Sequence, residues 1–445
     1  MAGFIGLVVS FCVIVSININ IEGDIMDIII TLNHIISVVF FLCYLYQFIY
    51  LLVGLFGKEK NQTAKKNHRY GVIVSARDEE KVVGLLIDSI KKQTYPEELI
   101  DVFVVADNCS DQTAKVAEAA GAKVYERKNP KKIGKGYALN FLFQKINKEY
   151  GYEAYDAFIV FDADNVIAPI YIEEMNKVFD SGYRIITSYR NSKNYGKNWI
   201  SAGYSLWFLR EARYLNKARM KLGTSCAVSG TGFLVSREII QKNDGWVHHL
   251  LTEDIEFTTD NIIAGEKIGY CGKAVLYDEQ PVKFGQSYRQ RLRWAKGFYQ
   301  VLRSYGRRLI QGVFSGSFGC YDMLMTIMPA MILTFLSIVI NLVAFIGGWI
   351  AGISELSQLY WTVGRTLVTL YITFFFMGTV TTITEWKKIY CPNFKKILYL
   401  FSFPLFMLTY VPISIIALFV KVEWKHIDHD VATDVEHIQN FAEHE

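Results

Sequence analysis

Carboxylates recur in this sequence where a short apolar run gives way to a polar one. The side chains concerned are Asp107, Asp162, Asp164, Glu253 and Asp254. Asp162 and Asp164 are spaced i, i+2 directly after the apolar run 158–161, so both carboxylates can reach one hard cation. Mg²⁺ is usually held by one or two carboxylates, with water and substrate phosphates completing its coordination. Such a triplet alone is more often a solvated turn, but the strand-like run before it favours a metal site.

Cationic side chains that could bind a phosphate occur in two other segments. Lys135 lies between two glycines at the start of a predicted helix, where an anion is favoured, although an ordinary exposed lysine is the alternative. In the second segment, Gln290, Arg293 and Trp294 would share one face of a helix. A guanidinium suits a diphosphate, and an indole suits the C–H face of a sugar ring. An interfacial belt of tryptophan and arginine is the alternative.

The apolar runs around these side chains predict a sheet whose strand ends bring them together. Residues 70–75, 101–106 and 156–161 are typical of buried parallel strands. Helical patterns alternate with them, as at residues 83–90 and 136–146. This alternation implies a parallel sheet covered on both faces, in which ligands bind beyond the carboxyl ends of the strands. An α/β domain is therefore predicted.

Long apolar segments flank this domain on both sides. The 445 residues are 51% hydrophobic, which excludes a disordered chain, and the net charge of +4 does not suggest a nucleic-acid binder. Residues 26–56 predict a membrane span, and residues 4–17 a shorter one. The basic residues that follow would place the α/β domain in the cytosol. Further spans are predicted at 323–353, 359–383 and 398–420.

Five segments follow from these patterns. They are two N-terminal transmembrane helices (1–57), a cytosolic domain (58–283), interfacial helices (284–318), about three spans with an interfacial segment (319–425) and a polar tail (426–445). An ordinary amphipathic helix is the alternative for the third segment. Pro404 and Pro412 leave open whether the last apolar segment spans the membrane or re-enters it. A metal site is conceivable in the His- and Asp-containing tail, but a solvated, disordered tail is expected.

The cysteines give no further site. All seven are scattered and none is spaced C-x-x-C, so neither a disulfide framework nor a zinc site is predicted.

The order of the motifs resembles the processive branch of glycosyltransferase family 2. That branch includes the synthases of cellulose, hyaluronan, chitin-like oligosaccharides and poly-N-acetylglucosamine. The resemblance rests, in chain order, on the segments Ser75–Glu80, Asp107–Asp111, Asp162–Asp164, Thr252–Asp254 and Gln290–Trp294. It covers about residues 70–300 and the arrangement of the flanking spans. It implies a GT-A-type, Rossmann-like α/β domain in the cytosol, inserted between transmembrane helices of the cell membrane and accompanied by interfacial amphipathic helices.

The resemblance also implies a role for each motif residue. The nucleotide-sugar would be bound by Arg77, Glu79, Asp107, Lys135, Asp162 and Arg293. Asp164, together with Asp162, would hold Mg²⁺ or Mn²⁺, and Asp254 would act as the general base. The acceptor sugar would be bordered by Trp294, Gln290, Gly230, Thr231 and Glu253.

These roles imply a membrane-embedded enzyme that polymerises a β-linked polysaccharide. One general base without a second nucleophilic carboxylate fits a single in-line displacement, which inverts the anomeric carbon. The donor would be a UDP-sugar such as UDP-glucose or UDP-N-acetylglucosamine, the acceptor the growing polysaccharide, and the surroundings a lipid bilayer. A non-processive family 2 enzyme that acts on a lipid or short saccharide is the nearest alternative. A transporter with a nucleotide-sensing domain is disfavoured by the few spans and the absence of a repeated transmembrane unit.

Overall fold

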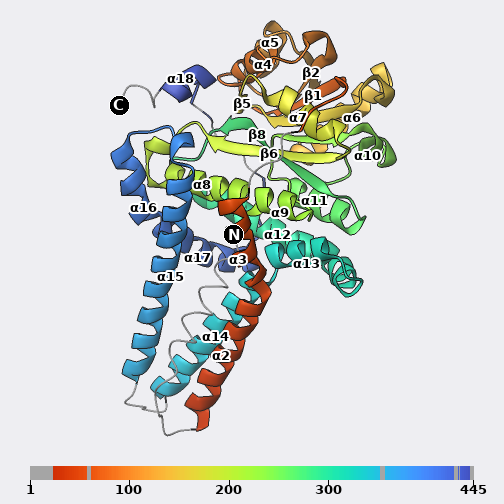
Figure 1. The fold of residues 1–445 in the computed structure, drawn as a ribbon. Helices are drawn as coiled ribbons and strands as arrows, with labels where there is room; N and C mark the ends of the chain where they lie inside the picture. The colour runs from red at the N-terminus through yellow and green to blue at the C-terminus, as the bar shows by residue number, and fades with distance from the viewer. Residues whose placement is uncertain (1–23, 58–61, 351–355, 425–428, 430, 441–445) are drawn as a thin grey trace.

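The computed structural model describes residues 24–57, 62–350, 356–424, 429 and 431–440. The predicted short span at residues 4–17 lies outside these ranges. Figure 1 shows an α/β domain at one end of the molecule and long helices that project from it. A layer of helices, which includes α8, α9, α12 and α13, lies between the two.

A mixed eight-stranded sheet forms the core of the α/β domain. Its strands, in order across the sheet, are β3 (Lys123–Arg127), β2 (Ile100–Asp107), β1 (Tyr70–Ala76), β4 (Ala157–Asp162), β7 (Phe233–Ser236), β6 (Ile185–Ser192), β8 (Ile268–Asp278) and β5 (Val166–Ile167). The three predicted strands are β1, β2 and β4, and they pair in parallel as expected.

The prediction of a wholly parallel sheet was wrong. β7 runs antiparallel to both β4 and β6, and β5 runs antiparallel to β8. β7 begins one residue after Gly232, whose backbone N–H donates to the Val160 carbonyl of β4 at 2.9 Å. Because β7 is antiparallel, its start lies at the edge of the sheet where β4 ends. The loop before β7 therefore reaches the carboxylates that follow β4.

Helices cover both faces of the sheet, because successive residues of a strand point to opposite sides. Val72 and Val74 of β1 pack with one set of helices, whereas Ile73 packs with the other. The first set is α4 (Val83–Lys91), α5 (Thr113–Ala119) and α7 (Tyr171–Asp180). The second set is α6 (Lys135–Tyr150), α10 (Arg237–Lys242) and α11 (Glu253–Ile263). The predicted helices at 83–90 and 136–146 correspond to α4 and α6.

A second group of helices joins the sheet to the membrane-type helices. It consists of α8 (Trp199–Arg210), the π-helical turn η4 (Glu211–Asn216), α9 (Lys217–Leu222), α12 (Phe284–Phe314) and α13 (Phe318–Ile327). Asn198 caps α8 by accepting hydrogen bonds from the backbone N–H groups of Ile200 and Ser201. The predicted helix with the tryptophan and arginine residues is α12, and its buried face includes Val301 and Leu309. Short 3₁₀ turns complete the chain at η1 (Glu97–Leu99), η2 (Tyr152–Ala154), η3 (Tyr195–Lys197) and η5 (Trp386–Lys388).

The projecting helices have apolar, exposed surfaces suited to lipid. They are α2 (Asp24–Tyr44), α3 (Tyr46–Phe56), α14 (Pro329–Ile350), α15 (Leu356–Thr384), α16 (Asn393–Leu408) and α17 (Tyr410–Phe419). Within the described residues, three stretches are long and apolar enough to cross a membrane: Thr31–Phe56, Leu367–Thr384 and Asn393–Phe419. The helices Phe318–Ile327 and Ile332–Val343 meet at 41° and would make a fourth if they act as one broken span. These helices suggest a membrane protein.

A buried ion pair links α9 to α13, and two tyrosines of α3 contact its carboxylate. Arg219 of α9 donates from Nε to Asp322 Oδ2 of α13 at 2.7 Å and from Nη2 to Oδ1 at 3.0 Å. Tyr46 and Tyr50 of α3 each donate a hydroxyl to the same carboxylate at 2.8 Å. A buried carboxylate is tolerated when its lone pairs are satisfied in this way. Three elements distant in sequence therefore meet at Asp322.

Candidate active site

A cavity of ≈ 270 Å³ brings the predicted site residues together. Its lining includes every residue of the predicted site except Thr231. At one end lie Ser75, Asp107 and Asp162, which stand at or near the carboxyl ends of β1, β2 and β4. The lining also includes Thr326 of α13, a helix of the joining group, and Tyr410 of the membrane-type helix α17. One cavity is thus lined both by the strand ends and by those helices.

The loop after β1 presents Arg77 and Glu79 to this cavity. Between them, Asp78 has a φ of 54°, a left-handed conformation in which an aspartate is tolerated better than most residues. Asp78 Oδ1 accepts hydrogen bonds from the backbone N–H of Ser110 at 2.6 Å and from its hydroxyl at 3.0 Å. Arg77 Nε and Nη1 are buried without a hydrogen-bond partner in the described part of the chain. The loop therefore places two N–H groups of Arg77, which have no hydrogen-bond partner among the described residues, beside the cavity.

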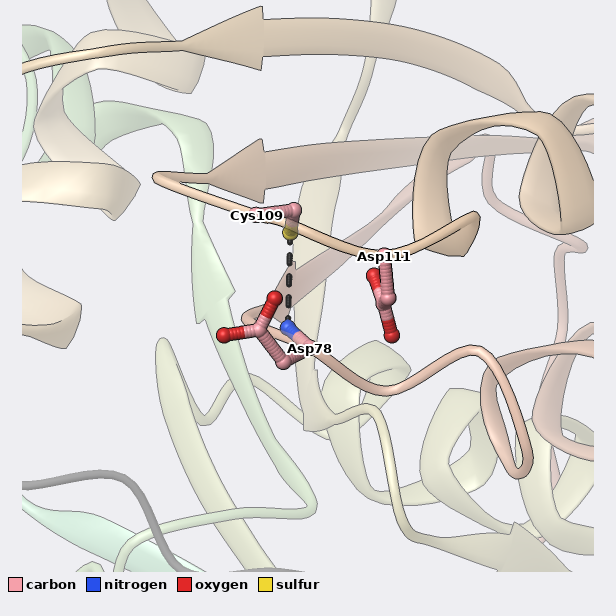
Figure 2. A group of neighbouring side chains, drawn as sticks. All are labelled: Asp78, Cys109 and Asp111. Carbon is pink, nitrogen blue, oxygen red and sulfur yellow. Dashed lines mark hydrogen bonds between the residues drawn. The ribbon is translucent and has the colours of Figure 1, made fainter.

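Asp78, Cys109 and Asp111 gather beside this loop, and Figure 2 shows that they come from two neighbouring loops. One potential ligand atom from each residue lies within 4.8 Å of the other two. Their polar groups already have partners, because the Asp78 N–H donates to Cys109 Sγ at 3.4 Å and Asp111 Oδ2 accepts from the Glu80 N–H at 3.1 Å. We interpret the cluster as a set of contacts that hold the two loops together, not as a metal site.

The two acids of the D-x-D triplet follow β4, as predicted. The Asp162 N–H donates to Thr231 Oγ1 at 2.9 Å, and the Thr231 hydroxyl donates to Asn165 Oδ1. Asp164 is buried, and its Oδ2 accepts from the Glu279 N–H at 3.3 Å. Thr231 therefore lies behind the turn and supports it. Thr231 is not among the residues that line the cavity, and its predicted place beside the acceptor stays a prediction.

Lys135, at the start of α6, links the triplet to the loop before β7. Its Nζ forms an ion pair with Asp162 and donates to the Gly230 carbonyl at 2.7 Å. Burial alone would lower the pKa of Lys135, but the carboxylates of Asp162, Glu253 and Asp254 raise it above its usual value. The lysine is therefore held as a cation among the acids. This fits an anion-binding role better than that of an ordinary exposed lysine.

Glu253 and Asp254 open α11, where the helix dipole favours negative charge. Burial raises the pKa of both carboxyls, and repulsion from Asp254 adds to the rise at Glu253. Gly230 has a φ of 79°, and a Cβ built on it would lie 3.8 Å from Asp254 Oδ2. A side chain there would be strained and would enter the space beside the acid. Gly230 thus keeps the approach to Asp254 open.

Gln290, Arg293 and Trp294 face the cavity from α12. The Trp294 ring packs edge to face against Tyr204 and Phe208 of α8, with centroid distances of 5.7 and 6.3 Å. Gln290 Oε1 is buried and has no hydrogen-bond partner among the described residues. The spacing of the three residues on one helical face is confirmed. They supply an aromatic surface, an unused acceptor and a cation.

Arg291, between Gln290 and Arg293, points away from the cavity. It is fully buried, and its Nη1 donates to the Phe406 carbonyl at 3.2 Å and to Thr409 Oγ1 at 2.7 Å. Arg291 therefore ties α12 to the junction of α16 and α17.

Two charged residues of the site were not predicted from the sequence. Arg190 of β6 forms an ion pair with Asp278 of β8, and its Nη1 donates to the Ser229 carbonyl at 3.0 Å. Its guanidinium lies 3.8 Å from the centroid of the Phe208 ring. Burial raises the pKa of Asp278, although Arg190 opposes the rise. Neither residue belongs to a recognisable sequence motif. The only sequence feature that could have indicated a site residue is the position of Asp278 at the end of an apolar strand.

The tail also reaches the site. His429 Nδ1 lies 2.8 Å from Glu79 Oε1, and Nε2 lies 3.7 Å from Asp164 Oδ2. Burial alone would lower the pKa of His429, but Asp164 and Glu79 raise it to about 10. Burial raises the pKa of Glu79 to about 7, despite the bond to His429. The expectation of a solvated, disordered tail is wrong for His429 and 431–440, because the acids of the site attract the imidazole.

Comparisons with known proteins identify the family. Residues 68–297 match the family described as glycosyltransferase like family 2. A β-monoglucosyldiacylglycerol synthase from Synechocystis is 24% identical over 242 residues, which are 53% of this chain and 49% of that protein. A poly-β-1,6-N-acetyl-D-glucosamine synthase from Staphylococcus epidermidis is 24% identical over 243 residues, which are 52% of this chain and 54% of that protein. The chain thus spans about half the length of the curated relatives that it matches.

A solved structure shows the same fold. It is a mannosyltransferase from Pyrobaculum calidifontis in complex with GDP-Man and Mn²⁺, similar with a TM-score of 0.56 and 15% identity. The match covers 89% of this chain and 99% of that one. This likeness confirms the expectation of a GT-A-type α/β domain flanked by apolar helices, although its sheet is mixed. Since the family match covers half of the sequence and contains the acidic motifs, the chain belongs to glycosyltransferase family 2.

Proposed function

We propose that this protein is a membrane-embedded, inverting synthase that extends a β-linked polysaccharide from a UDP-sugar and exports it. The observation that carries the proposal is one cavity lined by Asp162 at the end of β4, by Asp254 at the start of α11, by Thr326 of α13 and by Tyr410 of the membrane-type helix α17. A hydrophilic chain made at such a site would be delivered directly to the membrane part. Direct delivery favours the proposal because moving one hydroxyl from water into an apolar environment without a hydrogen bond costs roughly 2–7 kcal/mol.

In this proposal Asp254 is the general base. Its raised pKa suits proton transfer from a sugar hydroxyl, since the carboxylate is more basic than an ordinary aspartate. The acceptor oxygen attacks the anomeric carbon as Asp254 takes the proton, and the bond to the diphosphate breaks on the opposite side. An α-linked donor would thus give a β-linked product. Trp294 would support the acceptor ring, and Gln290 would accept a hydrogen bond from it.

The leaving diphosphate would be bound by cations of this chain. Lys135 is already held at Asp162, and Arg293 lines the same cavity. Arg77 has unused donors for the nucleotide end. Fixed positive charges that face a developing negative charge lower the barrier without reorganisation.

The residues present fit a divalent ion, Mg²⁺ or Mn²⁺. Asp162 and Asp164 supply hard oxygen ligands, and His429 approaches Asp164 through Nε2 while its Nδ1 bonds to Glu79. A carboxylate on the far nitrogen is the usual partner of a metal-binding histidine, because it fixes the tautomer. We therefore propose Asp164 and His429, with Asp162, as the residues that would hold the ion. When bound, the ion would supply charge neutralisation at the diphosphate.

We also propose the arrangement of the chain at the membrane. Residues 58–283 would form the cytosolic catalytic domain, and 284–318 would lie at the membrane surface. The remaining helices would cross or line the cell membrane.

A second candidate function is glycosylation of a lipid. The cavity's contact with α13 and α17 would equally admit an acceptor that stays in the bilayer. The similarity to a β-monoglucosyldiacylglycerol synthase favours this candidate, whereas the similarity to a poly-β-1,6-N-acetyl-D-glucosamine synthase favours the first.

Turnover of nucleotide-sugars by the purified protein tests both candidates. The full chain in detergent with lipid is incubated with Mg²⁺ or Mn²⁺ and each of several UDP-sugars, and UDP release is compared with that of Asp254→Asn. Release above the variant, with a product resistant to lipid extraction and long by size analysis, supports the synthase. One sugar added to an extractable lipid supports the second candidate. No release with any donor contradicts both.

A further inference from the structure

The chain after α17 returns to the sheet and ends its described part in α18 (Val435–Asn440). Figure 1 shows α18 beside β5, at the edge of the sheet. Ile438 is 2% exposed and packs against Val166 of β5 and Tyr277 of β8. Gln439 Nε2 donates to the Tyr277 hydroxyl at 3.0 Å. A helix of six residues is too short to be stable alone, so this docking orders it.

Between α17 and α18, Trp424 and His429 lie at the donor end of the cavity. The Arg77 guanidinium lies 4.9 Å from the centroid of the Trp424 ring. His429 bonds to Glu79, and the Val431 N–H donates to Glu279 Oε2 at 2.9 Å. Trp424 and His429 both line the cavity. Trp424, His429 and Val431, which we name the strap, thus contact the loops that follow β1 and β8.

The strap is held from both sides. On the N-terminal side of the strap, α17 packs against α12. On its C-terminal side, Ile438 packs into a recess formed by Val166 and Tyr277 at the edge of the sheet. Eight residues lie between His429 and Ile438, so docking of α18 confines His429 to the neighbourhood of Glu79 and Asp164. Confinement by a short linker raises the effective concentration of a group at its site without any new contact.

We propose that Ile438 is a positioning residue of the transferase: by docking α18 at the edge formed by β5 and β8, it holds Trp424 and His429 at the donor end of the active site. This inference rests on the proposed function, because it assigns the strap to donor binding. Ile438 touches neither the donor nor the reacting atoms. Its effect should therefore appear in the KM for the donor rather than in kcat.

Substitution of Ile438 in the full chain tests the proposal. Ile438→Ala empties the recess and should raise the KM for the UDP-sugar about fivefold or more, with kcat within twofold of wild type. Ile438→Leu refills the recess and should restore the wild-type KM. Glu436→Ala is the matched control, because Glu436 is exposed on the same helix and should leave KM unchanged.

Two further measurements separate this inference from a general loss of structure and from the proposed function. The melting temperature of each variant in detergent should equal that of wild type, because α18 lies outside the core of the sheet. UDP binding by calorimetry should weaken in parallel with KM in Ile438→Ala. An unchanged KM and UDP affinity in Ile438→Ala overturns the proposal, as does a loss confined to kcat or a loss that Leu does not rescue. If wild type shows no turnover, the proposed function fails, and UDP affinity alone then decides the role of Ile438.

Discussion

Gly297 of α12 lies directly against Thr252, the residue before Glu253 and Asp254. A Cβ built on Gly297 would lie 2.4 Å from Thr252 Oγ1 and 2.5 Å from its Cγ2. Real Cβ atoms do not approach other atoms so closely, so the two segments touch because residue 297 has no side chain. This contact sets the distance between the helix that carries Trp294 and the helix that carries Asp254.

Gly297→Ala should therefore separate the proposed acceptor platform from the proposed base. We expect a fall in kcat/KM of about tenfold or more, because a displacement of 1 Å can cost as much as 10²-fold in rate. Gly285→Ala in the same helix is the control, since its Cβ would meet nothing closer than Arg289 Nη1 at 3.9 Å. Steady-state kinetics on both variants would show the difference, and equal kcat/KM values would contradict the prediction.

The pH dependence of kcat should follow Asp254. Burial raises the pKa of this carboxyl above its ordinary value of about 3.9. A base must be deprotonated, so kcat should be full at high pH and should fall, as pH decreases, at a higher pH than an ordinary aspartate would give. We expect one acid limb in a plot of log kcat against pH at saturating donor. A kcat that stays constant down to pH 4 in an intact protein would argue against Asp254 as the base.

Lys135→Met should abolish most of the turnover. The substitution removes the cation held between Asp162 and the Gly230 carbonyl. The negative charge of the diphosphate would then be neutralised by fewer positive charges. We expect a loss of kcat of about 10²-fold, comparable to removal of one stabilising donor in other active sites. Lys135→Arg should retain more activity because it keeps the charge. Lys131→Met removes an exposed lysine of the same loop and should behave as wild type in the same assay.

Arg219→Met should destabilise the whole protein. It would leave the Asp322 carboxylate buried without its cation, and breaking such a pair costs about 3–5 kcal/mol. The double variant Arg219→Met/Asp322→Leu should recover much of this loss, because no uncompensated charge remains. Arg184→Met breaks an exposed pair with Glu266 and should change stability by less than about 1 kcal/mol. Melting temperatures in one detergent would rank the variants, and a double variant no more stable than Arg219→Met would contradict the explanation.

The sequence allowed the strand ends to be predicted, because that information is local. Asp107 and Asp162 each end an apolar run, and parallel strands bring such ends to one edge. Gln290 and Trp294 could be placed on one face by helical spacing alone. The antiparallel β7 escaped prediction because its direction depends on pairing with β4 and β6, not on its own four residues.

The contacts of the tail could not be predicted for a different reason. His429 and Glu79 are 350 residues apart, and neither segment has a periodic pattern that indicates the other. The charged residues of the tail predict exposure to solvent when the sequence is considered alone. In the folded protein, the carboxylates of the site provide partners for His429. The hydrogen bonds of the Thr231 hydroxyl with the Asp162 N–H and with Asn165 Oδ1 could not be predicted either, because they join two loops distant in sequence.

The carboxylate of Asp322 has one further consequence. Its lone pairs are satisfied by a guanidinium from α9 and by two phenols from α3, so each partner is needed to keep the others in place. A fragment that lacks α3 would lose both phenols and expose the tyrosine-lined contact to water. Efforts to make a soluble fragment should therefore keep residues 46–50 or replace the carboxylate itself.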